Sequence, residues 1–190
     1  MKNIAIFASG SGTNTENIIK YFSNKKFAKV RLVLSNRREA FVLKRAAMHD
    51  VKTMFFEQAD FYNSDTVLNY LLSEKVDFVV LAGFLWLVPG NILEKYEGKI
   101  INIHPALLPA HGGKGMYGEK VHRSVIESRE HESGITIHYV NKKYDEGDII
   151  FQARCKVDPS DTPESLASKV HALEYEYFPR IIEDLILKLD

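Results

Sequence analysis

Two polar side chains at the end of an apolar run are the first candidates for chemistry. Asn102 and His104 lie two residues apart in the segment IINIHPALLP, which covers residues 100–109. Side chains at positions i and i+2 of a strand leave by the same face, so an amide and an imidazole are expected together just before Pro105. Such a pair could donate hydrogen bonds and transfer protons to a bound substrate. The alternative is an asparagine that caps a turn and a histidine that packs on its neighbours.

An acidic turn further along the chain supplies a partner for the imidazole. Asp145 lies in the sequence YDEGD, residues 144–148. A nearby carboxylate favours the protonated histidine ring, and that form donates a hydrogen bond to a developing oxyanion. We therefore expect Asp145 beside His104, although the same turn could be a solvated acidic hairpin. His138, in the alternating run ITIHYV, is expected to support the site, with a packed core histidine as the alternative.

A glycine-rich turn near the N-terminus is typical of anion binding. It separates a short apolar run from a helical pattern, so its N–H groups and the helix N-terminus can surround a single phosphate. Its residues are Gly10, Ser11, Gly12, Thr13 and Asn14. Thr15 replaces the third glycine of a dinucleotide motif and no lysine has P-loop spacing, which disfavours NAD and nucleoside triphosphates. Thr13 and Glu16 fit a capping box at the helix start. The alternative is a turn that binds nothing.

Other common chemistries lack their residues in this sequence. The histidines at positions 104, 111, 122, 131 and 138 have no zinc-site spacing, and no G-x-S-x-G motif marks a serine nucleophile. We therefore predict no metal. Cys155, the only cysteine, lies in the alternating run IIFQARCKV, which favours a strand residue over a nucleophile. The amide, imidazole and carboxylate that remain suit transfer of an acyl-like group to an amine.

Short apolar runs alternate with helical patterns through the first hundred residues. The runs predict strands over residues 4–8, 30–34, 51–56, 76–82 and 99–104. The patterns between them predict a first helix that contains Ile18, Ile19 and Phe22, and further helices over 41–49, 64–72 and 89–96. This alternation predicts an α/β fold with a doubly wound, mostly parallel sheet. The polar candidates then lie at the carboxyl ends of strands, where ligands of such sheets bind.

The second part of the chain has a different pattern. Residues 110–118 contain four glycines and are expected to form a mobile loop near a ligand. A helix over 121–128 and two antiparallel strands over 135–140 and 148–157 follow. The apolar spacing from residue 165 onward predicts one long helix with a bend or break at Pro179. Together these elements predict a C-terminal antiparallel β-β-α extension of the sheet.

The composition fits one globular domain. Of 190 residues, 45% are hydrophobic and 26% are charged, and 25 Lys and Arg balance 25 Asp and Glu. A chain of this length forms one core, so we expect a single domain over residues 1–190. The neutral balance gives no reason to expect nucleic acid as a partner, and no apolar run is long enough for a signal peptide or membrane span. We expect a cytoplasmic protein that is a monomer or a homodimer.

Five motifs, in order, resemble one enzyme family over nearly the whole chain. They are SGSGTN, AGF, NIHPALLP, GITIHYV and the DEGD turn. Together they are similar to the phosphoribosylglycinamide formyltransferases of purine synthesis. The resemblance implies formyl transfer from the co-substrate 10-formyltetrahydrofolate to the amine of glycinamide ribonucleotide. It also implies a phosphate-binding half over about 1–100 and a folate-binding and catalytic half over about 101–190.

The resemblance assigns roles to individual residues. Asn102, His104 and Asp145 would be catalytic. The glycine turn would bind the substrate phosphate, Pro105 would contact the substrate, and Glu174 would hold the ribose hydroxyls. The folate would contact Phe84, Leu85, Trp86, Leu87, Val88, Asn102, His138 and Val140. Independently of the family, the segment GFLWLV predicts a flat apolar wall suited to a fused heterocycle, with ordinary core packing, Trp86 included, as the alternative. The chain departs from the family pattern at Ala106 and in the longer loop over 110–118.

Two other functions remain open from the sequence. One is a related folate enzyme, either a methionyl-tRNA formyltransferase or a formyltetrahydrofolate hydrolase. Each of these would carry a further domain, which we do not expect in a chain of 190 residues. The other is a non-catalytic module that binds a folate or a nucleotide. Such a module would bind ligand without transferring a formyl group.

Overall fold

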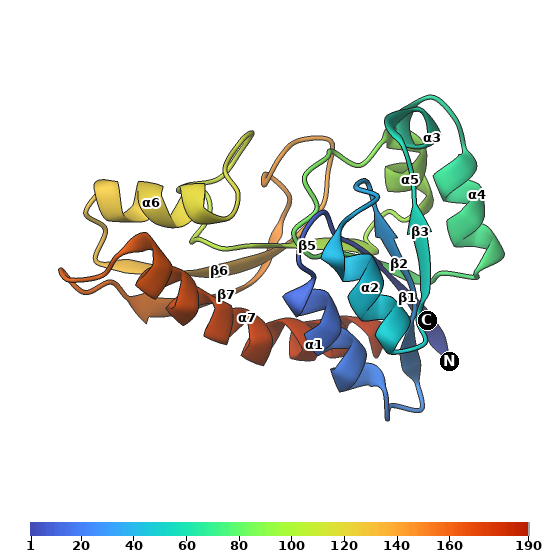
Figure 1. The fold of residues 1–190 in the computed structure, drawn as a ribbon, viewed down its shortest axis with the longest axis horizontal. Helices are drawn as coiled ribbons and strands as arrows, with labels where there is room; N and C mark the ends of the chain where they lie inside the picture. Colours follow the sequence, from blue (N-terminus) through green and yellow to red (C-terminus); the bar gives the residue numbers. More distant parts are fainter. Residues whose placement is uncertain (190) are drawn as a thin grey trace.

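Seven strands form one sheet in the computed structural model, which describes residues 1–189 (Figure 1). Their order across the sheet is β3-β2-β1-β4-β5-β6-β7. The strands are β1 (Lys2–Phe7), β2 (Ala28–Ser35), β3 (Lys52–Phe55), β4 (Phe78–Leu81), β5 (Ile100–His104), β6 (Glu132–Tyr139) and β7 (Ile149–Lys156). Strands β1 to β5 pair in parallel, and β6 is antiparallel to both β5 and β7. The predicted α/β fold, with its mostly parallel sheet and antiparallel extension, is confirmed.

Helices connect the strands and cover both faces of the sheet. They are α1 (Thr13–Phe22), α2 (Phe41–Met48), α3 (Gln58–Tyr62), α4 (Thr66–Ser73), α5 (Gly90–Lys95), α6 (Glu119–Glu127) and α7 (Pro163–Ile186). Helix α3 has five residues, too few for helical spacing to be recognised in the sequence, and it is absent from the prediction. Within residues 1–189, no helix has the length and apolar character needed to cross a membrane.

The longest helix, α7, continues through Pro179, where the sequence predicted a bend or break. A proline inside a helix lacks the N–H that would bond the carbonyl four residues earlier, here the carbonyl of Tyr175. The side-chain amide of Asn17 on α1 donates to that carbonyl at 2.9 Å and replaces the missing hydrogen bond. Of the predicted bend or break, the break is therefore wrong, and α7 packs as one element that carries Glu174 to the carboxyl edge of the sheet.

Alternate residues of β1 face opposite sides of the sheet. Ile4 and Ile6 pack in a core formed with α1, α2 and α7, whereas Ala5 and Phe7 pack in a second core with α3, α4 and α5. All four side chains are buried. This is the period-2 pattern of a strand covered on both faces, and it fixes the register of the sheet because a slip by one residue would exchange the two cores.

The sheet reverses its winding between β1 and β4. Strand β1 has β2 on one side and β4 on the other, and β5 lies beyond β4. The carboxyl ends of β1, β4 and β5 lie near one another. Strand β1 ends before the glycine turn, β4 ends before Gly83, and β5 ends at His104. Open α/β sheets bind ligands at such a switch point, because the loops there diverge and leave a crevice.

Candidate active site

The glycine turn after β1 is fastened to α2. The backbone N–H of Val42 donates to the carbonyl of Gly10 at 3.1 Å, and Nε of Arg45 donates to the carbonyl of Ser11 at 2.9 Å. Gly12 has a φ of 78°, and a Cβ at this position would lie 2.4 Å from Cγ2 of Val42. Only glycine fits there. With these carbonyls held by α2, the free N–H groups of the first turn of α1 remain available to an anion.

The predicted capping box at the start of α1 is wrong. Gly12 is the N-cap residue, and no side-chain cap is formed. The carboxylate of Glu16 instead pairs with two cationic side chains, Lys20 of its own helix and Arg45 of α2. It also contacts the ring of His49, the residue after α2, with Nε2 at 3.2 Å. The hydrogen bonds from Lys20 and His49 are the main reason that the pKa of Glu16 falls to about 2. Glu16 thus helps to hold Arg45 against the glycine turn.

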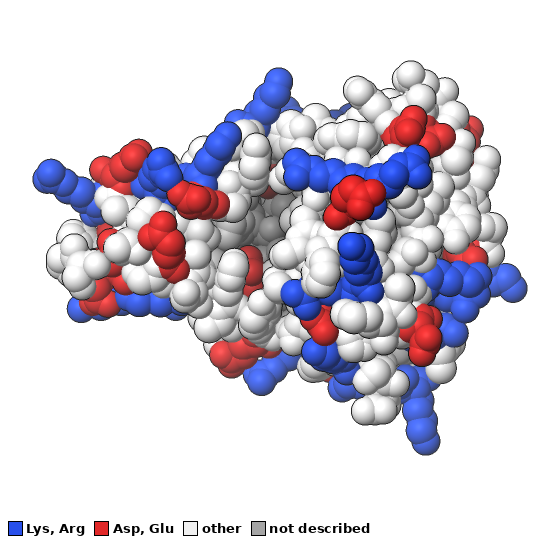
Figure 2. Space-filling view, in the orientation of Figure 1, with Lys and Arg blue, Asp and Glu red and all other residues white. Residues whose placement is uncertain are grey.

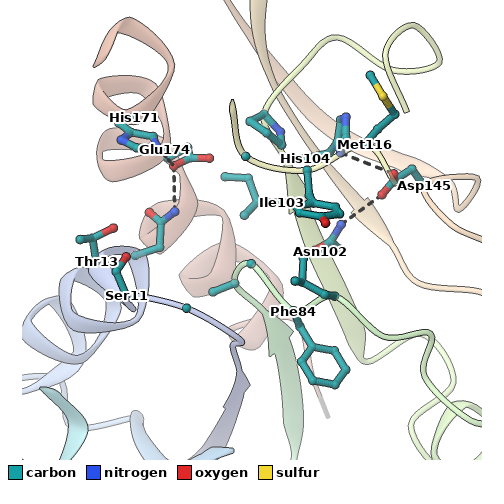
Figure 3. A pocket seen from close by; sticks show the side chains of 18 of the residues that line it. Ser11, Thr13, Phe84, Asn102, Ile103, His104, Met116, Asp145, His171 and Glu174 are labelled. Atoms are coloured by element: carbon teal, nitrogen blue, oxygen red, sulfur yellow. Dashed lines mark hydrogen bonds and ion pairs between the residues drawn. The ribbon is translucent and has the colours of Figure 1, made fainter. Parts of the chain in front are cut away.

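Glu174 lies at the far side of the same crevice (Figure 3) and is bonded to Asn14. The side-chain Nδ2 of Asn14 donates to Oε2 of Glu174 at 2.8 Å. Oδ1 of Asn14 is buried and has no hydrogen-bond partner within the described chain. Burial raises the pKa of Glu174, and the bond from Asn14 and the charge of His171 only partly oppose this effect. The pair therefore presents one buried acceptor without a donor, Oδ1 of Asn14, beside the buried carboxyl of Glu174.

Asn102, His104 and Asp145 lie in contact on the opposite wall (Figure 3). Nδ1 of His104 lies 3.5 Å from Oδ2 of Asp145, and Nδ2 of Asn102 donates to Oδ1 of Asp145 at 3.4 Å. Strand β5 supplies the first two residues, and the turn between β6 and β7 supplies the third. The backbone N–H of Gly113 donates to Oδ2 of Asp145 at 2.9 Å and holds the carboxylate in place. The structure thus brings the three predicted catalytic residues together.

The other ring nitrogen of His104 is already bonded. Nε2 lies 2.8 Å from the backbone carbonyl of His111, and a carbonyl oxygen can only accept a hydrogen bond. The proton of the neutral ring is therefore on Nε2, which leaves a lone pair on Nδ1. Nδ1 is the atom that can take up a proton next to Asp145.

Burial decides the charge of this pair. It lowers the pKa of His104 below the ordinary 6.5, and the charge of Asp145 opposes this effect without overcoming it. The expectation that Asp145 keeps the imidazole protonated is therefore not met in this arrangement. Burial pushes the pKa of Asp145 up, but the neighbouring rings of His138 and His104, together with the N–H of Gly113, bring it below the ordinary 3.8. At neutral pH the site holds a neutral imidazole beside a carboxylate.

His138 fixes the orientation of the Asn102 amide. Nδ1 of His138 donates to the carbonyl of Tyr139 at 2.7 Å, so its Nε2 is an acceptor. Nδ2 of Asn102 lies 3.1 Å from that Nε2 and donates to it. Both amide hydrogens of Asn102 are therefore directed to His138 and Asp145. The hydrogen bond from Asn102 to Asp145 is longer than the one to His138, so the amide hydrogen that points to Asp145 is the one that a ligand oxygen can attract.

Two adjoining cavities meet at these residues. The larger, of about 330 Å³, is lined by the whole glycine turn and by Asn102, His104, Pro105, Asp145 and Glu174. The smaller, of about 50 Å³, is lined by predicted folate contacts, namely Phe84, Trp86, Leu87, Val88, Asn102, His138 and Val140. Phe84, Asn102, Tyr144 and Asp145 line both cavities. Leu85, also a predicted folate contact, lines the larger one. Figure 2 shows the molecular surface hollowed between α6 and α2, with basic and acidic side chains interspersed around the hollow.

An aromatic cluster supports the wall of the smaller cavity. Phe84 and Trp86 pack edge-on and tilted against Phe56 and Phe61, with ring centroids 5.6 to 6.1 Å apart. The hydroxyl of Tyr62 donates to the carbonyl of Leu87 at 2.9 Å. Such offset contacts rigidify the segment GFLWLV, so the wall is formed before a ligand arrives.

Several residues of the site have no signal in the sequence analysis. The structure adds Met116 and Tyr117 from the loop over 110–118, His122 from α6 and His171 from α7 to the larger cavity. His171 and Glu174 are three residues apart on a predicted helix and therefore lie on one face. This spacing could have identified His171 as a site residue once Glu174 was assigned. His122 lies among buried apolar positions of α6, where a core histidine is the ordinary interpretation.

Burial raises the pKa of Cys155 on β7, which disfavours a reactive thiolate, as its strand pattern indicated.

The sheet order and the polar group at its carboxyl edge define an α/β enzyme. The chain belongs to the formyl transferase family, whose model matches residues 2–182. It is 34% identical to the phosphoribosylglycinamide formyltransferase of Bacillus subtilis, over 98% of this chain and 95% of that protein. It is 37% identical to the chloroplastic phosphoribosylglycinamide formyltransferase of Arabidopsis thaliana, over 95% of this chain, and spans 64% of the length of that relative.

A solved structure agrees with this assignment. The crystal structure of phosphoribosylglycinamide formyltransferase from Bacillus halodurans superimposes with a TM-score of 0.88 at 35% identity. The match covers 100% of this chain and 97% of that one. The family resemblance drawn from the five sequence motifs is confirmed.

Proposed function

We propose that this protein transfers a formyl group from 10-formyltetrahydrofolate to the amine of glycinamide ribonucleotide in the cytoplasm. The observation that carries the proposal is the boundary between the two cavities, where Asn102 and Asp145 line both. An acceptor in one cavity and a donor in the other would meet at these side chains and beside His104. The named relatives are phosphoribosylglycinamide formyltransferases, which supports this pair of substrates.

The larger cavity fits a small phosphorylated acceptor. The phosphate would lie at the glycine turn, where the N–H groups of the first turn of α1 have no intrahelical partner. Oδ1 of Asn14 is a buried acceptor without a donor, and the ribose hydroxyls of glycinamide ribonucleotide would supply that donor and bond the adjacent carboxyl of Glu174. Pro105 lines the cavity next to His104, where the glycinamide amine would lie.

The smaller cavity fits one face of a pterin ring. Its apolar wall comes from Phe84, Trp86 and Val88, and its polar edge comes from His138 and Asp145. A flat apolar wall with a few polar groups is the usual form of a heterocycle site. When bound, the folate co-substrate supplies the activated formyl carbon. Val140 and Leu87 would close the pocket around its ring.

His104 and its neighbours would carry the proton transfers. As the acceptor amine forms a bond to the formyl carbon, Nδ1 of His104 takes the proton that the amine loses. The charge of Asp145 at 3.5 Å stabilises the imidazolium. Nδ2 of Asn102 donates to the oxygen that becomes negative. His104 then returns the proton to the leaving nitrogen of the donor as the old carbon–nitrogen bond breaks, so the enzyme ends in its starting state.

The test is a donor assay with and without the acceptor. Purified protein is mixed with 10-formyltetrahydrofolate, glycinamide ribonucleotide is added or withheld, and folate absorbance is followed while mass spectrometry detects the formylated acceptor. The proposal predicts donor consumption only with acceptor present, and one formylated product for each donor used. Consumption of donor without acceptor would identify a hydrolase. Ligand binding without turnover would identify a non-catalytic module.

A further inference from the structure

The segment after Pro109 touches the candidate active site at two points. The backbone carbonyl of His111 accepts the hydrogen bond from Nε2 of His104, and the N–H of Gly113 donates to Oδ2 of Asp145. Both members of the His104 and Asp145 pair are therefore held by one short stretch of backbone. No motif of the sequence analysis gave this stretch a role beyond lying near a ligand.

The backbone of His111 has an uncommon conformation. Its φ is 54°, in the left-handed region that few residues other than glycine adopt. Asp145, which faces the other nitrogen of His104, has a φ of 56°. Such conformations cost roughly 1 kcal/mol or more for a residue with a Cβ and persist only where the surroundings hold them. The two groups that contact His104 thus both come from strained backbone.

The side chain of His111 is what holds this backbone. Nδ1 of its ring is hydrogen-bonded to Oγ of Ser124 on α6 at 2.8 Å. Nε2 is buried without a hydrogen-bond partner among the described residues and lies 3.6 Å from a carboxylate oxygen of Glu130. The ring is 11% exposed, so it is fixed between the loop and the helix. Helix α6 packs in turn against α7. The position of the His111 carbonyl is therefore set by contacts that lie outside both cavities.

We propose that His111 is a positioning residue for His104. Its carbonyl keeps the ring proton on Nε2 and so leaves the lone pair of Nδ1 facing Asp145 and the cavity, while Ser124 anchors the side chain that makes this possible. This inference rests on the proposed function for its effect on turnover, but its structural part, the tautomer of His104, exists without any substrate. A carbonyl here plays the part that a carboxylate has behind many catalytic imidazoles.

The test compares two variants that weaken the anchor with one that does not. Ser124→Ala removes the hydroxyl partner and leaves residue 111 intact, whereas His111→Val removes the ring and disfavours a positive φ because valine is β-branched. His131→Val is the matched control, since His131 is exposed and has no side-chain contact with the site among the described residues. His111→Asn is the rescue variant, because asparagine adopts the left-handed region readily and its side-chain amide, at the place of Nδ1, can still bond the hydroxyl of Ser124. Circular dichroism and thermal melting establish that each variant is folded.

Nitrogen NMR of the His104 ring, without substrate, gives the direct measurement. In the wild type and in His131→Val we expect one tautomer with the proton on Nε2. In Ser124→Ala and His111→Val we expect signals of both tautomers. In formyl-transfer assays we expect kcat to fall about 10- to 100-fold in these two variants, with KM for both substrates within about threefold, because orientation and not binding is lost. His111→Asn should recover most of kcat and the single tautomer.

Three results would overturn the inference. The first is a wild-type His104 ring with its proton on Nδ1. The second is a single Nε2 tautomer in the folded His111→Val variant, which would mean that the anchor is unnecessary. The third is a change in KM with an unchanged kcat in Ser124→Ala and His111→Val. A wild type that shows the expected tautomer but formylates no glycinamide ribonucleotide would refute the proposed function and leave the positioning role of His111 standing.

Discussion

Nδ1 of His104 lies 3.5 Å from Oδ2 of Asp145, although the two residues come from different parts of the fold. Strand β5 ends at His104, whereas Asp145 lies in the turn after β6, the strand that pairs with β5 in antiparallel direction. Both side chains are largely buried, at 4% and 11% exposure. In such surroundings charge is costly unless it is paired, so the imidazole is neutral before catalysis and becomes charged only when it takes the proton of the substrate amine beside the carboxylate.

The first prediction concerns the pH dependence of activity. Because burial lowers the pKa of His104 and Asp145 raises it, removing the carboxylate should lower this pKa further. A neutral His104 is required, so kcat/KM is lost as pH falls through that pKa. We expect the acid limb of the wild-type profile below pH 6.5, and the acid limb of Asp145→Asn at lower pH still, with kcat reduced about 100-fold. An acid limb that moves upward in the variant would contradict the assignment.

The second prediction concerns the glycine turn. Gly12→Ala introduces a Cβ 2.4 Å from Cγ2 of Val42 at a φ of 78°, so the turn must move. We expect a loss of about 1–3 kcal/mol in the free energy of unfolding, and KM for glycinamide ribonucleotide raised at least about tenfold. Gly90→Ala is the control, because a Cβ there meets nothing within 4 Å and no positive φ is involved. Denaturant titration and initial rates measure both effects, and equal behaviour of the two variants would be evidence against a fitted phosphate turn.

The third prediction concerns Glu174. Burial raises its pKa, so the folded protein resists ionisation of this carboxyl. A raised folded pKa means that stability is fully present below the unfolded pKa and declines as pH rises toward the folded pKa. Glu174→Gln should therefore match the wild type in stability near pH 4 and exceed it near pH 8, while KM for glycinamide ribonucleotide rises. Thermal melting at the two pH values checks the first part. A variant less stable than the wild type at pH 8 would show that the ionised carboxyl is stabilising.

The fourth prediction concerns His122. Burial lowers the pKa of His122 to about 4. Between this pKa and the ordinary 6.5, His122 is therefore protonated in the unfolded chain and neutral in the folded protein. Stability then falls as pH drops from about 6.5 toward 4 and is unaffected by this group above that window. Between pH 7 and pH 5, the free energy of unfolding of His122→Gln should therefore fall about 1–2 kcal/mol less than that of the wild type. Urea titrations at the two pH values measure it, and an unchanged loss in the variant would mean that His122 is accessible to protons.

The sequence predicted the strands well because their apolar runs are short, continuous and separated by clear turns. The pairing of Asn102 with His104 on one face followed from the period of a strand. The helix over Pro179 was predicted to bend or break because the compensating donor, Asn17, lies on a different helix and no local pattern reveals it. Gly12 as N-cap was missed because Glu16, the expected capping partner, is drawn to Arg45 on α2.

The contacts around His104 were the hardest part to predict. The closeness of Asp145 could be proposed from its chemistry and from the family, but no spacing rule joins a strand end to a distant turn. The bond from Nε2 to the carbonyl of His111 could not be foreseen, because every residue has a carbonyl and only the fold decides which one is near. The neutral state of the ring followed from burial, which a pairwise argument about His104 and Asp145 omits.

Single-turnover formyl transfer by His104→Asn tests the central claim most directly. Enzyme in excess over donor, with saturating glycinamide ribonucleotide, isolates the chemical step, and calorimetry gives the dissociation constant of the acceptor. If Nδ1 of His104 carries the proton, the rate of this step falls about 1,000-fold while the dissociation constant changes less than about threefold. A rate within a few-fold of the wild type, or a loss confined to acceptor binding, would contradict the account.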